Sequence, residues 1–235
     1  MINASLAVQL AHYWINKHQN EKYTIPTING GNVADIMPLD KYAIGLTNTK
    51  WLGRCEMLVK GRITYFLDAA HTVDSMQNCA EWFEKQSFQK PQQKWKVFRI
   101  LVFNCTMDRD PVPLLSKLFE IGFDLAIFTT NNLGNVKALN SDVSNFTVTT
   151  QFEKEICANN SQAWSKLGHN KYIKVSNITE ALQAIELESD HLSTTTPSCP
   201  VHVLVTGSVH LVGGFIRFIH PDFNNNIRNN GNDKL

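Results

Sequence analysis

From about residue 55 onward, short apolar runs alternate with longer segments of helical spacing, and this alternation restricts the fold more than any other feature of the chain. The apolar runs predict strands at residues 63–67, 98–103, 125–128, 146–148, 173–175 and 201–205. Helical patterns lie between them, at residues 73–86, 112–121, 153–166, 178–187 and 208–218. Alternating strands and helices favour a mostly parallel sheet with helices on both faces. We therefore expect an α/β fold.

The first 50 residues depart from this pattern and predict a separate region. Residues 4–17 have apolar side chains at near-helical spacing, so we expect an amphipathic helix there. Residues 18–50 are polar, and they predict a linker with one short strand at residues 42–46. Further along, the polar stretches 130–145 and 188–200 predict surface insertions. The tail from residue 222, rich in Asn and charged residues, predicts disorder.

The charge balance narrows the choice of partner. The chain has 22 Lys and Arg against 21 Asp and Glu, and this net charge of +1 offers no electrostatic footprint for nucleic acid or an anionic membrane. No apolar run reaches the roughly 18 residues needed for a membrane span. The five cysteines form no CxxC pair, so neither a disulfide framework nor a metal site is predicted. We expect reduced thiols in a cytosol-like compartment, and partners that are small molecules or proteins.

Polar side chains follow three of the predicted strands, at the point where each strand ends. Asp68 and His71 follow the strand at 63–67, Asp108-Arg109-Asp110 follows 98–103, and Thr206-Gly207-Ser208 follows 201–205. Open α/β sheets bind ligands in the crevice beyond the carboxyl ends of their strands. Asp68 and His71 are therefore the first candidates for ligand contact. The alternative is that Asp68 caps the next helix.

Several weaker sequence features have a structural interpretation as well as a functional one. Asp108-Arg109-Asp110 favours an internally paired turn. Backbone amides near Gly207 and Ser208 are suited to a carboxylate or phosphate at the start of a helix, and Gly213-Gly214 favours close packing of that helix on the sheet. Arg54, in a short turn, is suited to a nucleotide, or simply lies on the surface. Neither the dinucleotide-binding pattern GxGxxG nor the phosphate-binding pattern G-x-x-x-x-G-K-S/T occurs.

Five short segments together resemble one known family, the folylpolyglutamate synthases of eukaryotic type. The segments are residues 3–7, 51–54, 67–72, 103–111 and 202–214, in this order. The family belongs to the Mur-ligase type of ATP-dependent amide ligases, which have a central ATPase domain and a C-terminal Rossmann-like domain of mixed sheet. The resemblance implies that residues 1–50 are the end of the central domain and a linker. It implies that residues 51–221 are the C-terminal ligase domain and that 222–235 are a disordered tail.

The resemblance also implies an activity and roles for individual residues. Such ligases use ATP and Mg²⁺ to form an acyl phosphate on the γ-carboxyl of a tetrahydrofolate, and the amine of L-glutamate then attacks it. Arg54 and Asp68 would contact the adenosine part of ATP, with Asn3 beside it. His71 and Ser208 would lie toward the incoming glutamate. The phosphate-binding loop and the magnesium ligands would lie upstream of residue 1, and the complete enzyme would be a cytoplasmic monomer, with a mitochondrial form if a targeting segment precedes it.

Three positions depart from the family pattern. The family usually has Pro where this chain has Leu52, and Gly where it has Ala69 and Met107. Ala69 is compatible if its φ is negative, whereas Met107 adds a long side chain to a ligand-facing turn.

Three interpretations of the chain remain open. In the first, it is a fragment, a truncated gene model or a short isoform of such a ligase, and we expect it to be inactive alone. In the second, it is a non-catalytic module that binds adenosine, glutamate or a full-length enzyme, which predicts an exposed apolar face on the helix at 4–17. An unrelated Rossmann-like dehydrogenase is disfavoured by the missing glycine pattern.

Overall fold

The computed structural model describes residues 2–18, 39–88, 96–105, 109–134, 150–168 and 171–220. These residues divide into two compact units, 1–51 and 52–235. The predicted strand at 146–148, the tail from 222, and Met107 lie outside the described residues.

The first unit contains two helices, α1 (Ile2–His18) and α2 (Leu39–Asn48). A hydrogen bond of 3.1 Å joins His12 Nδ1 to the Tyr42 hydroxyl across them. The helix predicted at 4–17 is confirmed, but the strand predicted at 42–46 is wrong, because α2 occupies it. Four of the five apolar residues of α2 stand at positions i, i+3, i+4 and i+7, which is helical spacing, and a five-residue window is too short to show it. These four residues are Leu39, Tyr42, Ala43 and Leu46, and the fifth, Ile44, is exposed.

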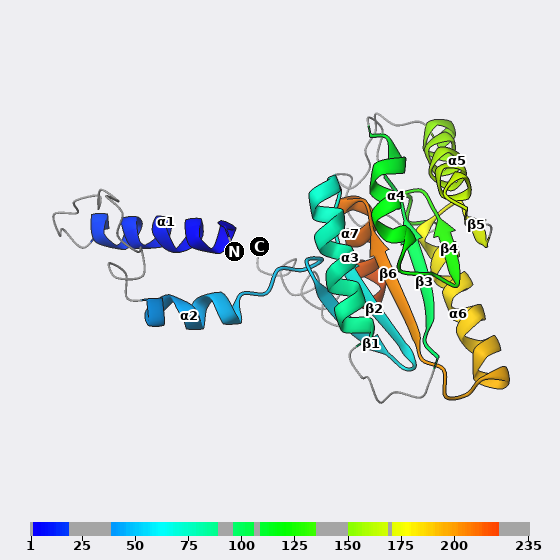
Figure 1. Ribbon diagram of the computed structural model, residues 1–235, viewed down its shortest axis with the longest axis horizontal. Helices are drawn as coiled ribbons and strands as arrows, with labels where there is room; N and C mark the ends of the chain where they lie inside the picture. Colours follow the sequence, from blue (N-terminus) through cyan, green and yellow to red (C-terminus); the bar gives the residue numbers. More distant parts are fainter. Residues whose placement is uncertain are drawn as a thin grey trace, which may run out of the picture. The chain divides into compact units, whose positions relative to one another are not determined.

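The second unit is a six-stranded mixed sheet with the order β1-β2-β6-β3-β4-β5 (Figure 1). β1 is antiparallel to β2, and the remaining pairs are parallel. The strands are β1 (Glu56–Lys60), β2 (Ile63–Asp68), β3 (Phe98–Phe103), β4 (Leu125–Phe128), β5 (Tyr172–Lys174) and β6 (Val201–Thr206). The helices are α3 (Val73–Ser87), α4 (Pro111–Phe119), α5 (Thr150–Lys166), α6 (Ile178–Thr195) and α7 (Val209–Ile219). The predicted α/β fold is confirmed.

Two hydrophobic clusters, one on each face, hold the helices to the sheet. Tyr65 and Leu67 of β2 pack with α6 and α7, whereas Phe66 between them packs with α3, α4 and α5. Successive side chains of a strand point to opposite faces, so one apolar run serves both clusters. Figure 1 shows the corresponding arrangement, with α3, α4 and α5 on one side of the sheet and α6 and α7 on the other.

The sequence did not predict β1 at the edge of the sheet. Its burial alternates weakly, and Met57 and Val59 are exposed, so no apolar run marks it. A two-residue turn, Gly61-Arg62, connects it to β2, and Gly61 has a φ of 62°, as the tight turns of hairpins require. The Arg62 guanidinium donates to the carbonyls of Thr196, Pro197 and Cys199, so this hairpin also fastens the segment before β6.

Two further expectations for this unit need correction. Residues 188–195 do not form a surface insertion but continue α6, because Ser189 is buried and Leu192 packs against the core. Gly213-Gly214 does not bring α7 close to the sheet. A Cβ on Gly214 would collide with Ile178 of α6, whereas one on Gly213 would meet no atom within 4 Å. The close approach is therefore between the two helices.

The two neighbouring glycines of α7 should respond to alanine in opposite directions. Gly213→Ala removes backbone freedom from the unfolded chain without a clash, and we expect it to raise the free energy of unfolding by about 0.5–1 kcal/mol. Gly214→Ala overpacks the contact with Ile178 and should lower it by about 1–3 kcal/mol. Urea denaturation of both variants measures this. Equal effects of the two would contradict the packing described.

His202 of β6 should make the fold sensitive to mild acid. Its Nδ1 lies 2.8 Å from the Ser87 hydroxyl, and burial, with a smaller effect of Arg99, lowers its pKa to about 4. In the unfolded chain a histidine titrates near its ordinary pKa of about 6.5. Protons therefore bind the unfolded chain first, and stability should fall as the pH drops from about 6.5 towards about 4.

Comparison with His202→Gln isolates this effect. The variant should lose less stability than the wild type between these pH values in urea denaturation. His191→Gln, at an exposed position of α6, is the matched control and should keep the wild-type pH dependence. A wild-type dependence in His202→Gln would show that other groups are responsible.

Candidate functional site

The three strand ends singled out in the sequence lie next to one another, as predicted. Asp68 of β2 pairs with Thr206 of β6, and Thr206 pairs in turn with Phe103 of β3. Beyond the strands, the Gly207 amide donates to the Ala70 carbonyl at 3.0 Å. Because β2, β6 and β3 are parallel neighbours, the polar residues after them share one edge of the sheet.

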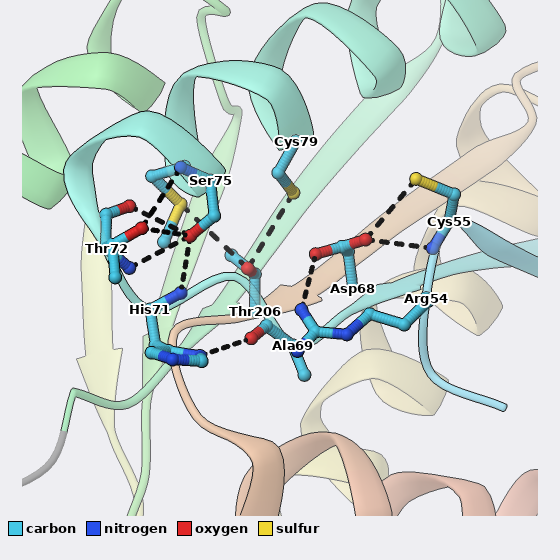
Figure 2. A network of polar contacts seen from close by, with 10 residues as sticks. Arg54, Cys55, Asp68, Ala69, His71, Thr72, Ser75, Cys79 and Thr206 are labelled. Carbon is cyan, nitrogen blue, oxygen red and sulfur yellow. Dashed lines mark hydrogen bonds and ion pairs between the residues drawn. The ribbon is translucent and has the colours of Figure 1, made fainter. Parts of the chain in front are cut away.

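Asp68 is 7% exposed and is held mainly by the turn that precedes β1. Its Oδ2 accepts from the Cys55 amide at 2.9 Å and from the Cys55 thiol at 3.4 Å, while Oδ1 lies 3.8 Å from Arg54 Nη1 (Figure 2). The alternative that Asp68 caps α3 is wrong. Thr72 is the cap, in a reciprocal arrangement with Ser75.

Arg54 stands in a turn that is fastened on two sides. The Gly53 amide donates to Glu56 Oε2 at 2.7 Å, and the Gly53 carbonyl accepts from the Ala69 amide at 3.0 Å. Gly53 has a φ of 71°, and a Cβ there would come within 2.7 Å of Val212 Cγ1, so the turn needs glycine. The Arg54 side chain remains 43% exposed and reaches Asp68 from the side.

His71 follows the same strand end, on another side of the chain from Arg54 (Figure 2). Its Nδ1 lies 2.9 Å from the Ala69 carbonyl oxygen, and its amide donates to the Ser75 hydroxyl at 3.0 Å. A carbonyl only accepts hydrogen bonds, so Nδ1 carries the proton. In the neutral ring Nε2 then keeps its lone pair and is the atom able to accept a proton.

Ser208 and Gly207 take up structural roles. Ser208 is buried and caps α7, with its hydroxyl accepting from the Leu211 amide at 3.5 Å. Of the amides near Gly207 and Ser208 that were expected to suit an anion, the Gly207 amide is already bound to the Ala70 carbonyl. The amides of the first turn of α7 follow at Val209 and His210, which are both exposed.

The remaining candidates are placed as follows. The side chain of Asn3 and all of Asp108 lie outside the described residues. Asp110 caps α4 by accepting from the Val112 amide at 3.0 Å. Ala69 is buried and has no positive φ, so its methyl group is compatible with the backbone.

Sequence reasoning missed Cys55. Among the described residues it is the one non-glycine residue with a positive φ, 45°. Partial burial, followed by the negative charge of Asp68, raises the pKa of its thiol to about 11. Its position directly after Arg54 was the available signal, but a cysteine in a polar turn does not by itself indicate a contact 13 residues away.

Two possible features are not found among the described residues. They contain no group of three or more His, Cys, Asp or Glu arranged to hold a metal ion. Within the same ranges, no helix has the length and apolar character to cross a membrane.

Comparison with known proteins places the chain. No family model matches it. Human mitochondrial folylpolyglutamate synthase is 30% identical over 93% of this chain, and the yeast enzyme (Saccharomyces cerevisiae, strain YJM789) is 31% identical over 91%. This chain is a relative of the folylpolyglutamate synthases. It spans 48% of the length of the human protein and 37% of the yeast protein, so about half or less of the curated relatives it matches.

Solved structures of folylpolyglutamate synthases share the fold. Mycobacterium tuberculosis folylpolyglutamate synthase complexed with ADP has a TM-score of 0.57 at 18% identity, over 79% of this chain and 36% of that one. A second structure of that enzyme, complexed with ADP and AMPPCP, has a TM-score of 0.56. At this identity the likeness establishes the Rossmann-like fold of this folylpolyglutamate synthase relative.

Asp68 and Arg54 should contribute very differently to its stability. Asp68→Ala leaves both the amide and the thiol of Cys55 without their acceptor, and we expect the free energy of unfolding to fall by about 1–3 kcal/mol. Arg54→Ala removes a long ion pair whose Arg54 side is 43% exposed and should change the free energy of unfolding by no more than about 1 kcal/mol. Urea denaturation at neutral pH tests both variants. If Arg54→Ala lost more stability than Asp68→Ala, the conclusion that Asp68 holds the turn would be contradicted.

Proposed function

We propose that this chain is the C-terminal part of an ATP-dependent amide ligase that adds L-glutamate to the γ-carboxyl of tetrahydrofolate or its polyglutamates. The observation that supports this proposal most is that Asp68, His71 and Ser208 lie at one edge of the sheet, in a chain related to the folylpolyglutamate synthases. In this proposal residues 1–50 end the central ATPase domain and residues 51–221 form the C-terminal domain.

Arg54 and Asp68 would serve the nucleotide. A carboxylate is a strong acceptor for ribose hydroxyls, and a planar guanidinium pairs with or stacks on a base. Asp68 is held in place by Cys55 on Oδ2, which leaves Oδ1 facing the more exposed Arg54. On the family resemblance, Asn3 would also serve the nucleotide.

His71 and Ser208 would serve the incoming glutamate. In the reaction, the γ-carboxylate of the folate takes the γ-phosphoryl group of ATP and releases ADP. The glutamate amine then attacks the acyl phosphate, phosphate leaves, and the amine loses a proton. The lone pair on His71 Nε2 is suited to bind that amine, and the positive end of α7, which Ser208 caps, is suited to a carboxylate.

Magnesium is expected with ATP, but the described residues do not fit it. They offer no cluster of three carboxylate, histidine or cysteine ligands, so no step is assigned to the metal within them. The sequence also lacks G-x-x-x-x-G-K-S/T, the pattern that cradles phosphates. Positioning and charge stabilisation supply most of the catalysis of phosphoryl transfer, so we infer that these 235 residues alone are inactive.

ADP binding tests the proposal directly. Isothermal titration of the pure chain should show ADP binding, weakened about fivefold or more in Arg54→Gln through loss of a charged contact. Lys60→Gln removes the same charge at the opposite end of the β1–β2 hairpin and should leave binding unchanged. No binding by the wild type, or equal loss in both variants, would refute the assigned nucleotide site.

Activity is measured on the same preparation. With ATP, Mg²⁺, L-glutamate and tetrahydrofolate, mass spectrometry should detect no glutamylated product from the chain alone. Product formation would show that the chain is a complete catalyst and would overturn the inferred inactivity.

A second candidate function is a non-catalytic module that pairs with a full-length synthase. Leu6, Leu10 and Trp14, spaced four residues apart, are 54%, 59% and 61% exposed on α1. Such spacing places them on one helix face, where a partner would bury them. Co-purification with a full-length synthase, lost in Leu10→Glu, would support pairing. A monomer that binds neither the synthase nor ADP would exclude this function.

A further inference from the structure

Cys55 contacts Asp68 through both its backbone and its side chain. Its amide and its thiol both donate to the same oxygen, Oδ2, at 2.9 and 3.4 Å. The backbone of Cys55 has a φ of 45°, a left-handed conformation that L residues seldom adopt, and in this conformation both donors reach one oxygen. Figure 2 shows amide and thiol on the same side of the carboxylate, with the Arg54 guanidinium on the other.

These contacts determine which oxygen of Asp68 is available. With two donors on Oδ2, the carboxylate is fixed about its Cβ–Cγ bond, and Oδ1 is turned toward Arg54. A carboxylate with one oxygen satisfied inside the protein presents the other in a fixed direction. A ligand that donates a hydroxyl then meets an acceptor that needs no reorientation.

We propose that Cys55 is a positioning residue for the nucleotide site: its thiol and amide fix Asp68 so that Oδ1 and Arg54 together receive the ribose of an adenine nucleotide. This inference rests on the proposed function, in that the ligand is the nucleotide assigned there. The role requires an intact S–H donor, which agrees with a thiol that partial burial and the charge of Asp68 keep protonated at neutral pH.

The coupling of Cys55 to Asp68 can be read from cysteine alkylation, independently of any ligand. Cys55 is exposed and the other four cysteines are buried, so iodoacetamide should modify it first. The thiolate is the reactive form. The charged groups that face it are Asp68 and Arg54, and the buried Cys79 lies near the same carboxylate.

Two variants should shift the alkylation rate in opposite directions. Asp68→Asn removes the negative charge and should speed alkylation at pH 8 about tenfold, equivalent to about one pKa unit. Arg54→Gln, at an exposed side chain that folding does not require, removes the positive charge and should slow it about two- to threefold. Unchanged rates in Arg54→Gln and a folded Asp68→Asn would show that the thiol is not coupled to this pair and would overturn the inference.

ADP affinity then separates positioning from a structural role. Cys55→Ser keeps a donor at the same position and should bind ADP within about twofold of the wild type, whereas Cys55→Ala should bind about fivefold more weakly. Both variants place an ordinary L residue at the same left-handed φ, and urea denaturation of each is the control that the protein is folded at the temperature of the titration. Wild-type affinity in Cys55→Ala would overturn the positioning role and leave the proposed function standing. A wild type that binds no ADP, with the alkylation shifts intact, would instead overturn the nucleotide assignment.

Discussion

The parallel pairing of β2 with β6 is the interaction on which the rest of the second unit depends. It joins a strand near the start of this unit to one near its end, and their register sets Asp68 beside Thr206. β6 is also the neighbour of β3, so both halves of the sheet meet on it. A shift of this register by one residue would exchange the side chains facing the two hydrophobic clusters, and burial on both faces opposes that strongly. The location of the candidate site is thus fixed by the core.

The polar residues at this edge divide into those that hold the backbone and those that remain available. Thr72, Ser75 and Ser208 satisfy amides at the beginnings of helices, and Gly53 and Gly207 make turns that other residues would obstruct. Asp68 and His71 are also anchored, yet each keeps an atom that its anchor does not use: Oδ1 of the carboxylate and Nε2 of the imidazole. A pair of anchored groups, each with an acceptor that its anchor leaves open, is what a site for a hydroxyl- and amine-bearing ligand requires.

The alternation of strands and helices could be read from the sequence because the buried strands are continuous apolar runs. β2, β3, β4 and β6 are buried along most of their length, and their positions were predicted to within a residue or two. β1 and α2 were missed because both are short and largely exposed, so no run of buried apolar residues marks them. The convergence of Asp68, His71 and Ser208 followed from topology alone. The contact of Cys55 with Asp68 could not be predicted in this way, because it depends on a positive φ that the residue type does not indicate.

The antiparallel direction of β1 has a consequence for how the second unit could be handled experimentally. Because β1 runs opposite to β2, its first residue, Glu56, pairs with Leu67 at the edge of the sheet that carries the candidate site. The chain therefore enters the sheet domain at the candidate site itself, and Arg54 and Cys55 form part of the entrance. A truncation at the boundary between the two units would leave only Leu52 and Gly53 ahead of Arg54. Fraying of a new chain end would then fall on Arg54 and Cys55, the residues proposed to contact and to position the nucleotide.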